Sequence, residues 1–127
     1  MARRGVFICI EGLDGCGKTT QARLLVRRLR KDCDAVYTAE PSKGPIGTFV
    51  KKRYLHSAAR GQVEVEALLF AADRLEHLKN EVLPALAEGK VVVSDRYVFS
   101  SYAYQGAAGL DLAWIEEVNK HALSPDL

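Results

Sequence analysis

The chain has 127 residues, of which 48% are hydrophobic, and its formal net charge is +2. This size and apolar content predict a single soluble domain with enough hydrophobic side chains to bury a core. A nearly neutral chain has no general electrostatic attraction to nucleic acid or to a membrane, so neither is expected as a partner. The three cysteines are odd in number and lack CxxC spacing. They predict no disulfide framework and no zinc site, and they favour a cytoplasmic location.

The N-terminal part predicts a strand, a glycine-rich loop and a helix in succession. Residues 6–10 form the apolar run VFICI, and apolar residues follow at helical spacing from Ala22 to Leu29. The stretch between them, EGLDGCGKTT at residues 11–20, matches the pattern GxxxxGK followed by Thr. A glycine turn can match these letters by chance. The strand-then-helix order, however, is the one that a phosphate-binding loop requires, and it favours phosphate binding.

The predicted loop suits a triphosphate, whose crowded negative oxygens are held well by backbone N–H groups that converge at a helix N-terminus. Glycines let the backbone approach these oxygens closely. Lys18 is expected to reach the outer phosphates, and the Thr19 hydroxyl is expected to ligate Mg²⁺. The residues predicted to bind the triphosphate are Gly12, Leu13, Asp14, Gly15, Cys16, Gly17, Lys18, Thr19 and Thr20.

The middle of the chain predicts one more strand and two helices. A short strand at residues 35–39 follows the first helix, which makes a βαβ unit and a parallel sheet with a right-handed crossover. A helix is predicted from about Ile46 to His56. A longer helix begins at residues 62–63 and continues or restarts toward Leu86. Its expected core face carries Val65, Leu68, Leu69, Ala72 and Leu75.

The C-terminal part predicts a third strand and a last helix. The β-branched run at residues 91–93 is typical of a strand that is buried on both faces. Gly106 and Gly109 mark a loop, and Asp111 is expected to cap the last helix. The apolar positions of that helix are Leu112, Ile115, Val118 and Leu123. The predicted fold class is therefore α/β, a P-loop NTPase-type parallel sheet flanked by helices.

Two charged residues follow the third predicted strand, at the carboxyl end where ligands bind in open α/β sheets. Asp95 is suited to hold Mg²⁺ directly or through water, and a helix N-cap is its alternative role. Arg96 is suited to bidentate recognition of a second phosphate. A surface salt bridge is the alternative for Arg96.

Phe70 and Arg74 lie four residues apart on one predicted helix, so their side chains share a stripe. An aromatic ring beside a guanidinium suits a nucleobase, through stacking and hydrogen bonds to the edge of the base. A core Phe with an exposed Arg is the alternative, and spacing alone slightly favours that alternative.

Four stretches together resemble the thymidylate kinases, a family of P-loop nucleoside monophosphate kinases. They are residues 11–20, Glu40-Pro41, LFAADR at residues 69–74, and DRY at residues 95–97 with SSYAYQG at residues 100–106. The first stretch is shared by many NTPases. The last stretch, combined with the Phe and Arg of the preceding helix, points to this family. The resemblance covers essentially the whole chain.

The resemblance implies a chemistry and a set of site residues. The implied reaction transfers the γ-phosphoryl group of ATP to dTMP, giving dTDP and ADP, with Mg²⁺ at Thr19 and Asp95. Asp14, Lys18 and Arg96 would act at the reacting phosphates, and Phe70 would stack on thymine. The implied acceptor-binding residues are Asp14, Glu40, Phe70, Arg74, Arg96, Ser100, Ser101, Tyr104 and Gln105. The resemblance also implies a homodimer.

The sequence departs from the family pattern at several positions. Ala39 stands where family members often have an Arg before the Glu-Pro pair. Ser42-Lys43 occupies a loop in which they have an Arg that contacts the acceptor, and Lys is a point charge without the guanidinium fork. Gly15 and Cys16, at variable positions of the glycine loop, resemble members whose catalytic Arg comes from a later lid. The sequence ends at residues 124–127, where the next strand of the family begins.

We therefore expect residues 1–127 to form a single P-loop kinase domain, truncated before the lid and the last strands and weak or inactive alone. The glycine-loop strand would then be an unpaired apolar edge. The alternatives are another (deoxy)nucleoside monophosphate kinase, a nucleoside kinase, and a catalytically silent nucleotide-binding fragment. A switch GTPase is disfavoured, because Asn119-Lys120 is followed by His121-Ala122 and lacks the Asp that would read guanine.

Overall fold

A parallel sheet of three strands lies at the centre of the fold in the computed structural model, which describes residues 4–55 and 62–127. The strands are β1 (Val6–Ile10), β2 (Ala35–Ala39) and β3 (Val91–Asp95), and their order is β1-β3-β2. All three predicted strands are confirmed, as is the α/β class with a parallel sheet. β3 separates β1 from β2, so these two strands share the sheet without pairing with each other.

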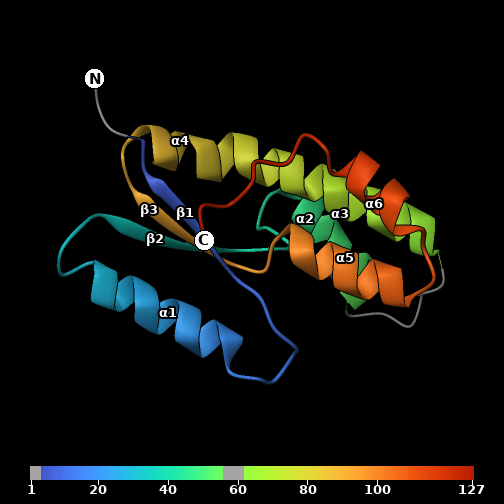
Figure 1. Ribbon diagram of the computed structural model, residues 1–127, viewed down its shortest axis with the longest axis horizontal. Coiled ribbons are helices and arrows are strands. Elements are labelled where there is room, and N and C mark those ends of the chain that lie inside the picture. Colours follow the sequence, from blue (N-terminus) through green and yellow to red (C-terminus); the bar gives the residue numbers. More distant parts are fainter. Residues whose placement is uncertain (1–3, 56–61) are drawn as a thin grey trace.

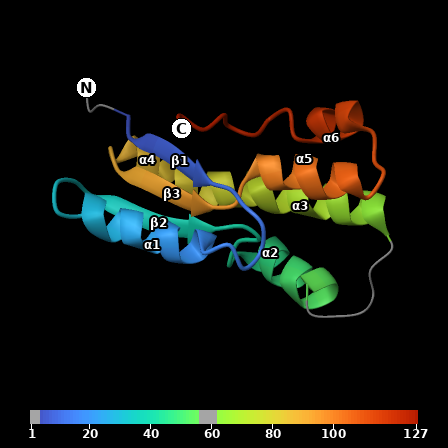
Figure 2. The same ribbon diagram turned by 60° about the horizontal axis from the view of Figure 1, so that its bottom comes forward.

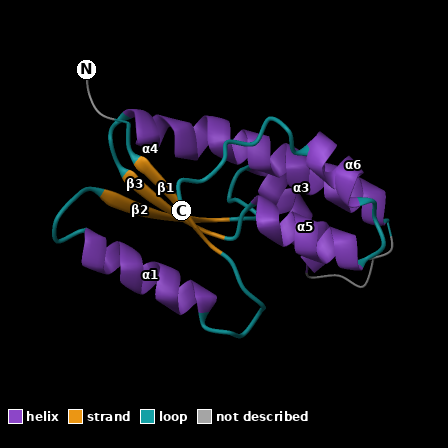
Figure 3. Cartoon of the chain, in the orientation of Figure 1, coloured by secondary structure: helices purple, strands orange, loops and turns teal. Residues whose placement is uncertain are grey.

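Helices cover both faces of this sheet and extend beyond its carboxyl edge (Figure 1). α1 lies on one face, η2 and α4 lie on the other, and α3, which runs directly into η2, lies beyond the carboxyl edge (Figure 3). α5 and α6 lie beyond the carboxyl ends of the strands, beside α3 (Figure 2). The bounds are α1 Lys18–Leu29, α2 Pro45–Val50, η1 Lys51–Leu55, α3 Val63–His77, η2 Leu78–Val82, α4 Leu83–Ala87, α5 Val98–Ala107 and α6 Leu112–Val118.

The core forms two layers because successive strand residues point to opposite faces. On one face, Val93 packs with Ala22 and Val26 of α1. On the other face, Val92 packs with a cluster that includes Phe7 and Leu86. Val92 and Val93 are both fully buried, which confirms that β3 is buried on both sides.

The register of the strands aligns their carboxyl ends. Ile10 of β1 and Ala39 of β2 both pair with Asp95 of β3. The segments that follow the three strands therefore leave the sheet at a common edge. The phosphate loop, Glu40-Pro41 and Arg96 all belong to these segments.

The core face predicted for α3 is wrong. Val65, Leu68 and Leu75 are 45%, 49% and 41% exposed. The buried face consists of Glu66, Ala67, Ala71, Asp73, Arg74 and His77. Polar side chains are buried on this face because they bind groups of other segments, such as Ser42 and Glu40, or line a cavity.

Three other expectations need correction. Residues 98–107 form α5, which was not predicted, and Gly106 lies inside it whereas Gly109, with φ of +100°, follows its end. α6 ends at Val118, so Leu123 lies outside it. The helix expected from about Ile46 to His56 corresponds to α2 and η1, and His56 lies outside the described residues.

The outer edge of β1 is not unpaired as expected. The backbone N–H of Asp126 donates to the carbonyl of Phe7 at 2.8 Å, and the N–H of Cys9 donates to the carbonyl of Leu127 at 2.9 Å. The N–H of Phe7 donates to the Asp126 carboxylate at 2.8 Å. The last residues therefore satisfy much of this edge. Within residues 4–55 and 62–127, no helix has the length and apolar character needed to span a membrane.

Candidate active site

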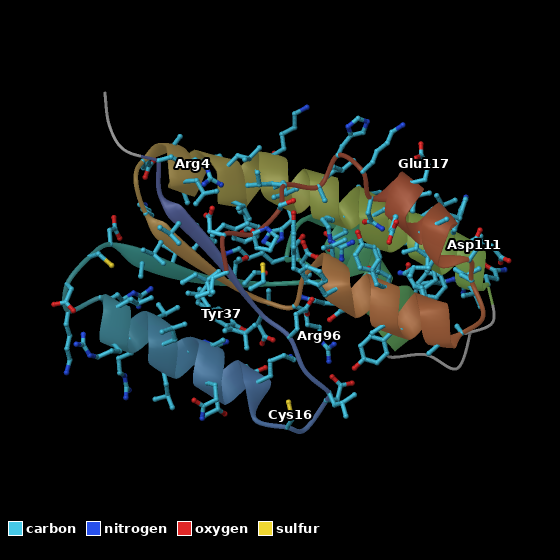
Figure 4. All side chains as sticks on the ribbon, viewed as in Figure 1. Arg4, Cys16, Tyr37, Arg96, Asp111 and Glu117 are labelled. Carbon is cyan, nitrogen blue, oxygen red and sulfur yellow. The ribbon has the colours of Figure 1, made fainter. Side chains whose placement is uncertain are left out.

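The phosphate loop runs through residues 11–17, between β1 and α1 (Figure 4). Gly15 and Gly17 have φ values of +78° and +88°, a left-handed conformation that disfavours any side chain. Gly17 precedes α1, and no side chain caps the first turn of this helix. The N–H groups of that turn are therefore available to an anion, as the loop motif predicts.

Three polar side chains, two from α1 and one from β2, meet Asp95 at the end of β3. Lys18 Nζ lies 2.5 Å from Asp95 Oδ1, and Thr19 Oγ1 donates to Oδ2 at 2.6 Å. Tyr37 of β2 donates its phenol proton to the same Oδ2 at 2.9 Å. Burial raises the pKa of Asp95, but the hydrogen bonds from Lys18, Thr19 and Tyr37 outweigh burial and lower it below its usual value.

This cluster fits a divalent cation. Asp95 is only 5% exposed and carries its charge at neutral pH, and the Thr19 hydroxyl is adjacent to it. A carboxylate and a hydroxyl are oxygen donors of the kind that Mg²⁺ prefers. Asp95 lies within β3, and Tyr97 is the residue that precedes α5, so the alternative role of Asp95 as a helix N-cap is wrong.

Glu11 joins the phosphate loop to α5, a contact that sequence reasoning missed. Its carboxylate accepts hydrogen bonds from the N–H groups of Tyr97 and Ser100, at 3.2 and 2.9 Å. It also accepts the Ser100 hydroxyl proton at 2.6 Å. A carboxylate at the exposed N–H groups of a first turn stabilises a helix, so Glu11 fixes α5 relative to the loop.

Arg96 lies between the phosphate loop and α5 (Figure 4). Its guanidinium binds the Asp14 carboxylate of the loop and donates to Ser100 Oγ at 3.1 Å. The guanidinium carbon lies 5.2 Å from the centre of the Tyr104 ring. Arg96 has φ of +78°, an uncommon value for a residue with a side chain. It does form a salt bridge, but its partner belongs to the phosphate loop and both residues line a cavity.

That cavity has a volume of about 180 Å³ and lies beside the loop, between α3 and α5. All nine residues expected to bind the acceptor line it: Asp14, Glu40, Phe70, Arg74, Arg96, Ser100, Ser101, Tyr104 and Gln105. Three lining residues were not predicted: Pro41, Glu66 and Tyr97. The Oε1 atom of Gln105 is buried and has no hydrogen-bond partner among the residues that the structure describes.

Arg74 is buried, at 2% exposure, so the alternative of an exposed Arg on α3 is wrong. Its Nε donates to Glu40 Oε1 at 2.9 Å, its Nη1 to Asn119 Oδ1 at 2.7 Å, and its Nη2 to Ser101 Oγ at 3.1 Å. A guanidinium has five N–H groups, so these three bonds leave two donors for the cavity. Sequence reasoning missed Asn119, which lies 45 residues away from Arg74.

A second buried residue, His77, holds the other oxygen of Glu40. Its Nδ1 lies 2.9 Å from Glu40 Oε2, and its Nε2 lies 2.6 Å from Thr38 Oγ1 and 3.2 Å from Glu81 Oε2. Both Glu40 oxygens are therefore occupied, although Glu40 lines the cavity. The spacing from Phe70 and Arg74 places His77 on the same face of α3, a sequence signal that could have identified it.

Lys43 does not lie at the cavity between α3 and α5. Its Nζ pairs with Glu81 Oε1 at 3.5 Å, and its side chain is 86% exposed. It lines a different, smaller hollow of about 100 Å³ with residues of the 42–44 loop and of α3 and η2. In this structure Lys43 is therefore not a replacement for the acceptor-binding Arg of the family pattern.

The parallel sheet, the glycine loop at the start of α1 and the acidic residue at the end of β3 define a P-loop nucleotide-binding protein. A family model described as "Thymidylate kinase" matches residues 10–127. The chain belongs to the thymidylate kinase family, in agreement with the resemblance of its motifs.

Similar proteins agree with this assignment. The chain is 50% identical to a probable thymidylate kinase of Pyrococcus horikoshii and 47% identical to one of Thermococcus gammatolerans, over 98% and 97% of its length. It spans 63% of the length of each of these relatives. A crystal structure of thymidylate kinase from Ehrlichia chaffeensis matches with a TM-score of 0.89 and 33% identity, over 98% of this chain and 72% of that one.

Proposed function

We propose that this protein transfers the γ-phosphoryl group of ATP to dTMP, giving dTDP and ADP. The proposal rests on one observation above all: the ion pair between Arg96 and Asp14 joins the acceptor cavity directly to the phosphate loop. Two sites for anions, one beside Lys18 and one beside Arg96, thus lie at the ends of the adjacent strands β1 and β3. Membership of the thymidylate kinase family supports the same reaction.

The groups in the cavity are complementary to thymine. The N3–H of thymine is a donor that the unpartnered Oε1 of Gln105 can accept, and the carbonyl at C4 can accept the remaining N–H groups of Arg74. Phe70 supplies an aromatic face for stacking. Cytosine has an amino group at C4 and no proton on N3. Its amino group would face the N–H donors of Arg74, and Gln105 Oε1 would receive no proton from N3.

The reaction itself needs positioning and charge stabilisation. An oxygen of the acceptor phosphate attacks the γ-phosphorus and forms the new P–O bond, while the bond to the bridging oxygen breaks and ADP leaves with that electron pair. The acceptor oxygen is already anionic, so no general base is required. Lys18 neutralises charge on the donor phosphates, and Arg96 neutralises the acceptor phosphate. Mg²⁺, when bound at Thr19 and Asp95, would neutralise and align the β- and γ-phosphate oxygens.

The test is a coupled assay of ADP release with dTMP, dUMP, dCMP and thymidine as acceptors. We expect residues 1–127 alone to react slowly and dTMP to be the best substrate. dUMP should be roughly 10- to 200-fold worse in kcat/KM, because it lacks only a methyl group, whereas dCMP should be worse by about 10⁴-fold, because it mispairs buried polar groups. Thymidine should be inactive because it has no phosphate for Arg96.

Other outcomes select other functions. A preference for thymidine would favour a nucleoside kinase. A preference for dCMP would contradict the proposed recognition of thymine by Gln105 and Arg74. Nucleotide binding in calorimetry with no ADP release for any acceptor would favour a catalytically silent binding protein.

We further propose that residues 1–127 form one P-loop kinase domain and that the protein is cytoplasmic, as the sequence predicts.

We also propose that the protein forms a homodimer through the exposed face of α3. Val65, Leu68 and Leu75 lie three and seven residues apart, a spacing that aligns them on one stripe of the helix. Each of them is more than 40% exposed. A second copy can cover this stripe with the same residues, as two-fold symmetry requires.

Leu68→Asp is expected to abolish this dimer, because it puts a charge in an apolar interface. Leu24→Asp on α1 is the matched control, since Leu24 is 47% exposed and Leu68 is 49% exposed. Sedimentation velocity should show the wild type and Leu24→Asp as dimers and Leu68→Asp as a monomer. A monomeric wild type, or a Leu68→Asp variant that remains dimeric, would rule out this interface.

A further inference from the structure

Tyr37 contacts the candidate metal site from β2, a strand that carries no residue of the phosphate-loop motif. It lies in β2 and pairs with Val93 of β3, two residues before Asp95. Its side chain extends along the sheet toward the carboxyl edge, and its hydroxyl donates to Asp95 Oδ2 at 2.9 Å. Figure 4 shows Tyr37 between the sheet and α1.

The two oxygens of Asp95 have different partners. Oδ2 accepts hydrogen bonds from both Thr19 and Tyr37, whereas Oδ1 is paired with Lys18 at 2.5 Å. Lys18 belongs to the motif that binds the outer phosphates of a nucleotide. When a nucleotide attracts Lys18, Oδ1 loses its cation, but Oδ2 keeps two hydroxyl donors.

The ring of Tyr37 is itself held in place. The guanidinium carbon of Arg23, on α1, lies 4.3 Å from the centre of the ring, within the range of a cation–π contact. The ring also packs beside the cluster formed by Ala22, Val26, Ala35 and Val93. A hydroxyl on a ring held by these contacts has little freedom, so it can define the orientation of the carboxylate it contacts.

We propose that Tyr37 is a positioning residue for Mg²⁺: its hydroxyl fixes Oδ2 of Asp95 and thereby directs Oδ1 toward the metal or a water bound to it. This inference rests on the proposed function, since it concerns the same phosphate site. Groups that orient a metal ligand without touching the metal typically change metal affinity by about 10- to 100-fold when they are removed.

The competing explanation is that Tyr37 only packs α1 against the sheet. The two explanations differ in which atom matters, because packing depends on the ring whereas positioning depends on the hydroxyl. They also differ in the role of the metal, because a packing defect weakens nucleotide binding with or without Mg²⁺. Tyr37→Phe removes the hydroxyl and keeps the ring and its contact with Arg23.

The experiment measures ADP binding by calorimetry in EDTA and over a series of Mg²⁺ concentrations. For Tyr37→Phe we expect the Mg²⁺ concentration at half-maximal enhancement to rise roughly tenfold, while ADP affinity in EDTA stays within about twofold of the wild type. Tyr102→Phe is the matched control and should behave as the wild type, because the Tyr102 ring packs edge to face on Phe99 in α5. An unchanged Mg²⁺ requirement in Tyr37→Phe, or equal weakening in EDTA and in Mg²⁺, would overturn the proposal.

A second comparison tests whether Tyr37 acts through Asp95. In an Asp95→Asn background, adding Tyr37→Phe should leave the Mg²⁺ requirement unchanged, since the carboxylate to be oriented is gone. A further tenfold rise in that background would show that Tyr37 acts by another route and would overturn the proposal. The readout involves ADP and Mg²⁺ without an acceptor, so a failure to phosphorylate dTMP would count against the proposed function alone.

Discussion

Replacing Lys18 by alanine is expected to lower the rate of phosphoryl transfer by about 10³-fold or more, the scale measured when a cation that stabilises a transferring phosphoryl group is removed. Lys18 begins α1, and its ammonium group lies at the junction of the phosphate loop and β3. During transfer, negative charge moves toward the bridging oxygen of the departing ADP, so a cation that stabilises this shift contributes more to kcat than to the binding of ATP.

The same substitution should leave the fold intact. Asp95 loses its ion pair with Lys18 but keeps the hydroxyl donors Thr19 and Tyr37, so its carboxylate is not left without partners. Circular dichroism and thermal unfolding should therefore remain close to the wild type. Loss of activity with retained structure separates a catalytic role of Lys18 from a structural one.

Lys120→Ala is the matched control for the loss of a lysine charge. Lys120 follows α6 and pairs with the exposed Glu117 of that helix at 2.8 Å, far from the phosphate loop in sequence. The assay is the coupled measurement of ADP release at saturating ATP and dTMP. Retention of more than a tenth of wild-type activity by Lys18→Ala would contradict every kinase function considered for this chain.

The sheet and the phosphate loop could be predicted from the sequence because their signals are local. Residues 6–10, 35–39 and 91–93 are short apolar runs, and each lies within a strand. The loop motif combines glycine conformations with a helix N-terminus, which depend on neighbouring residues only. The order of the strands could not be predicted from such local signals. β3 pairs with both other strands, and these pairings join segments more than 50 residues apart.

The buried side of α3 could not be predicted by hydrophobic periodicity, because the helix buries polar residues and exposes apolar ones. Arg74 and His77 are buried since Glu40, Asn119 and other distant groups satisfy them. Such partners come together only through the tertiary fold, so a pattern within one helix does not reveal them. The family resemblance did include Arg74 in the expected site, because it compares whole sites and not periodicity, and the structure places Arg74 in the wall of the cavity.

Glu40→Ala is expected to lower the free energy of unfolding by about 3–5 kcal/mol, the loss typical of breaking a buried ion pair from one side. Glu40 is 6% exposed, and its two oxygens hold Arg74 and His77, both at 2.9 Å. Alanine leaves the Arg74 charge buried without its carboxylate. Domains of this size have stabilities of about 5–15 kcal/mol, so the variant should be close to its unfolding threshold.

Glu40→Gln should be milder. The amide oxygen can still accept the N–H of Arg74, but the side chain no longer carries the negative charge that balances the guanidinium. We expect a folded variant whose KM for dTMP rises more than its KM for ATP, because Arg74 lines the acceptor cavity and not the phosphate loop.

Urea unfolding followed by fluorescence and circular dichroism provides the measurement for these variants. Glu117→Ala, which breaks the exposed pair with Lys120, is the control and should leave the unfolding midpoint unchanged. Glu40→Ala and Glu117→Ala each remove one carboxylate from an ion pair with an N–O distance of 2.8–2.9 Å. The expected difference in their stability therefore comes from burial of the Glu40 pair. If Glu40→Ala is as stable as Glu117→Ala, then Glu40 does not balance the buried Arg74 charge, and the orientation of Arg74 toward the base must depend on Asn119 and Ser101 instead.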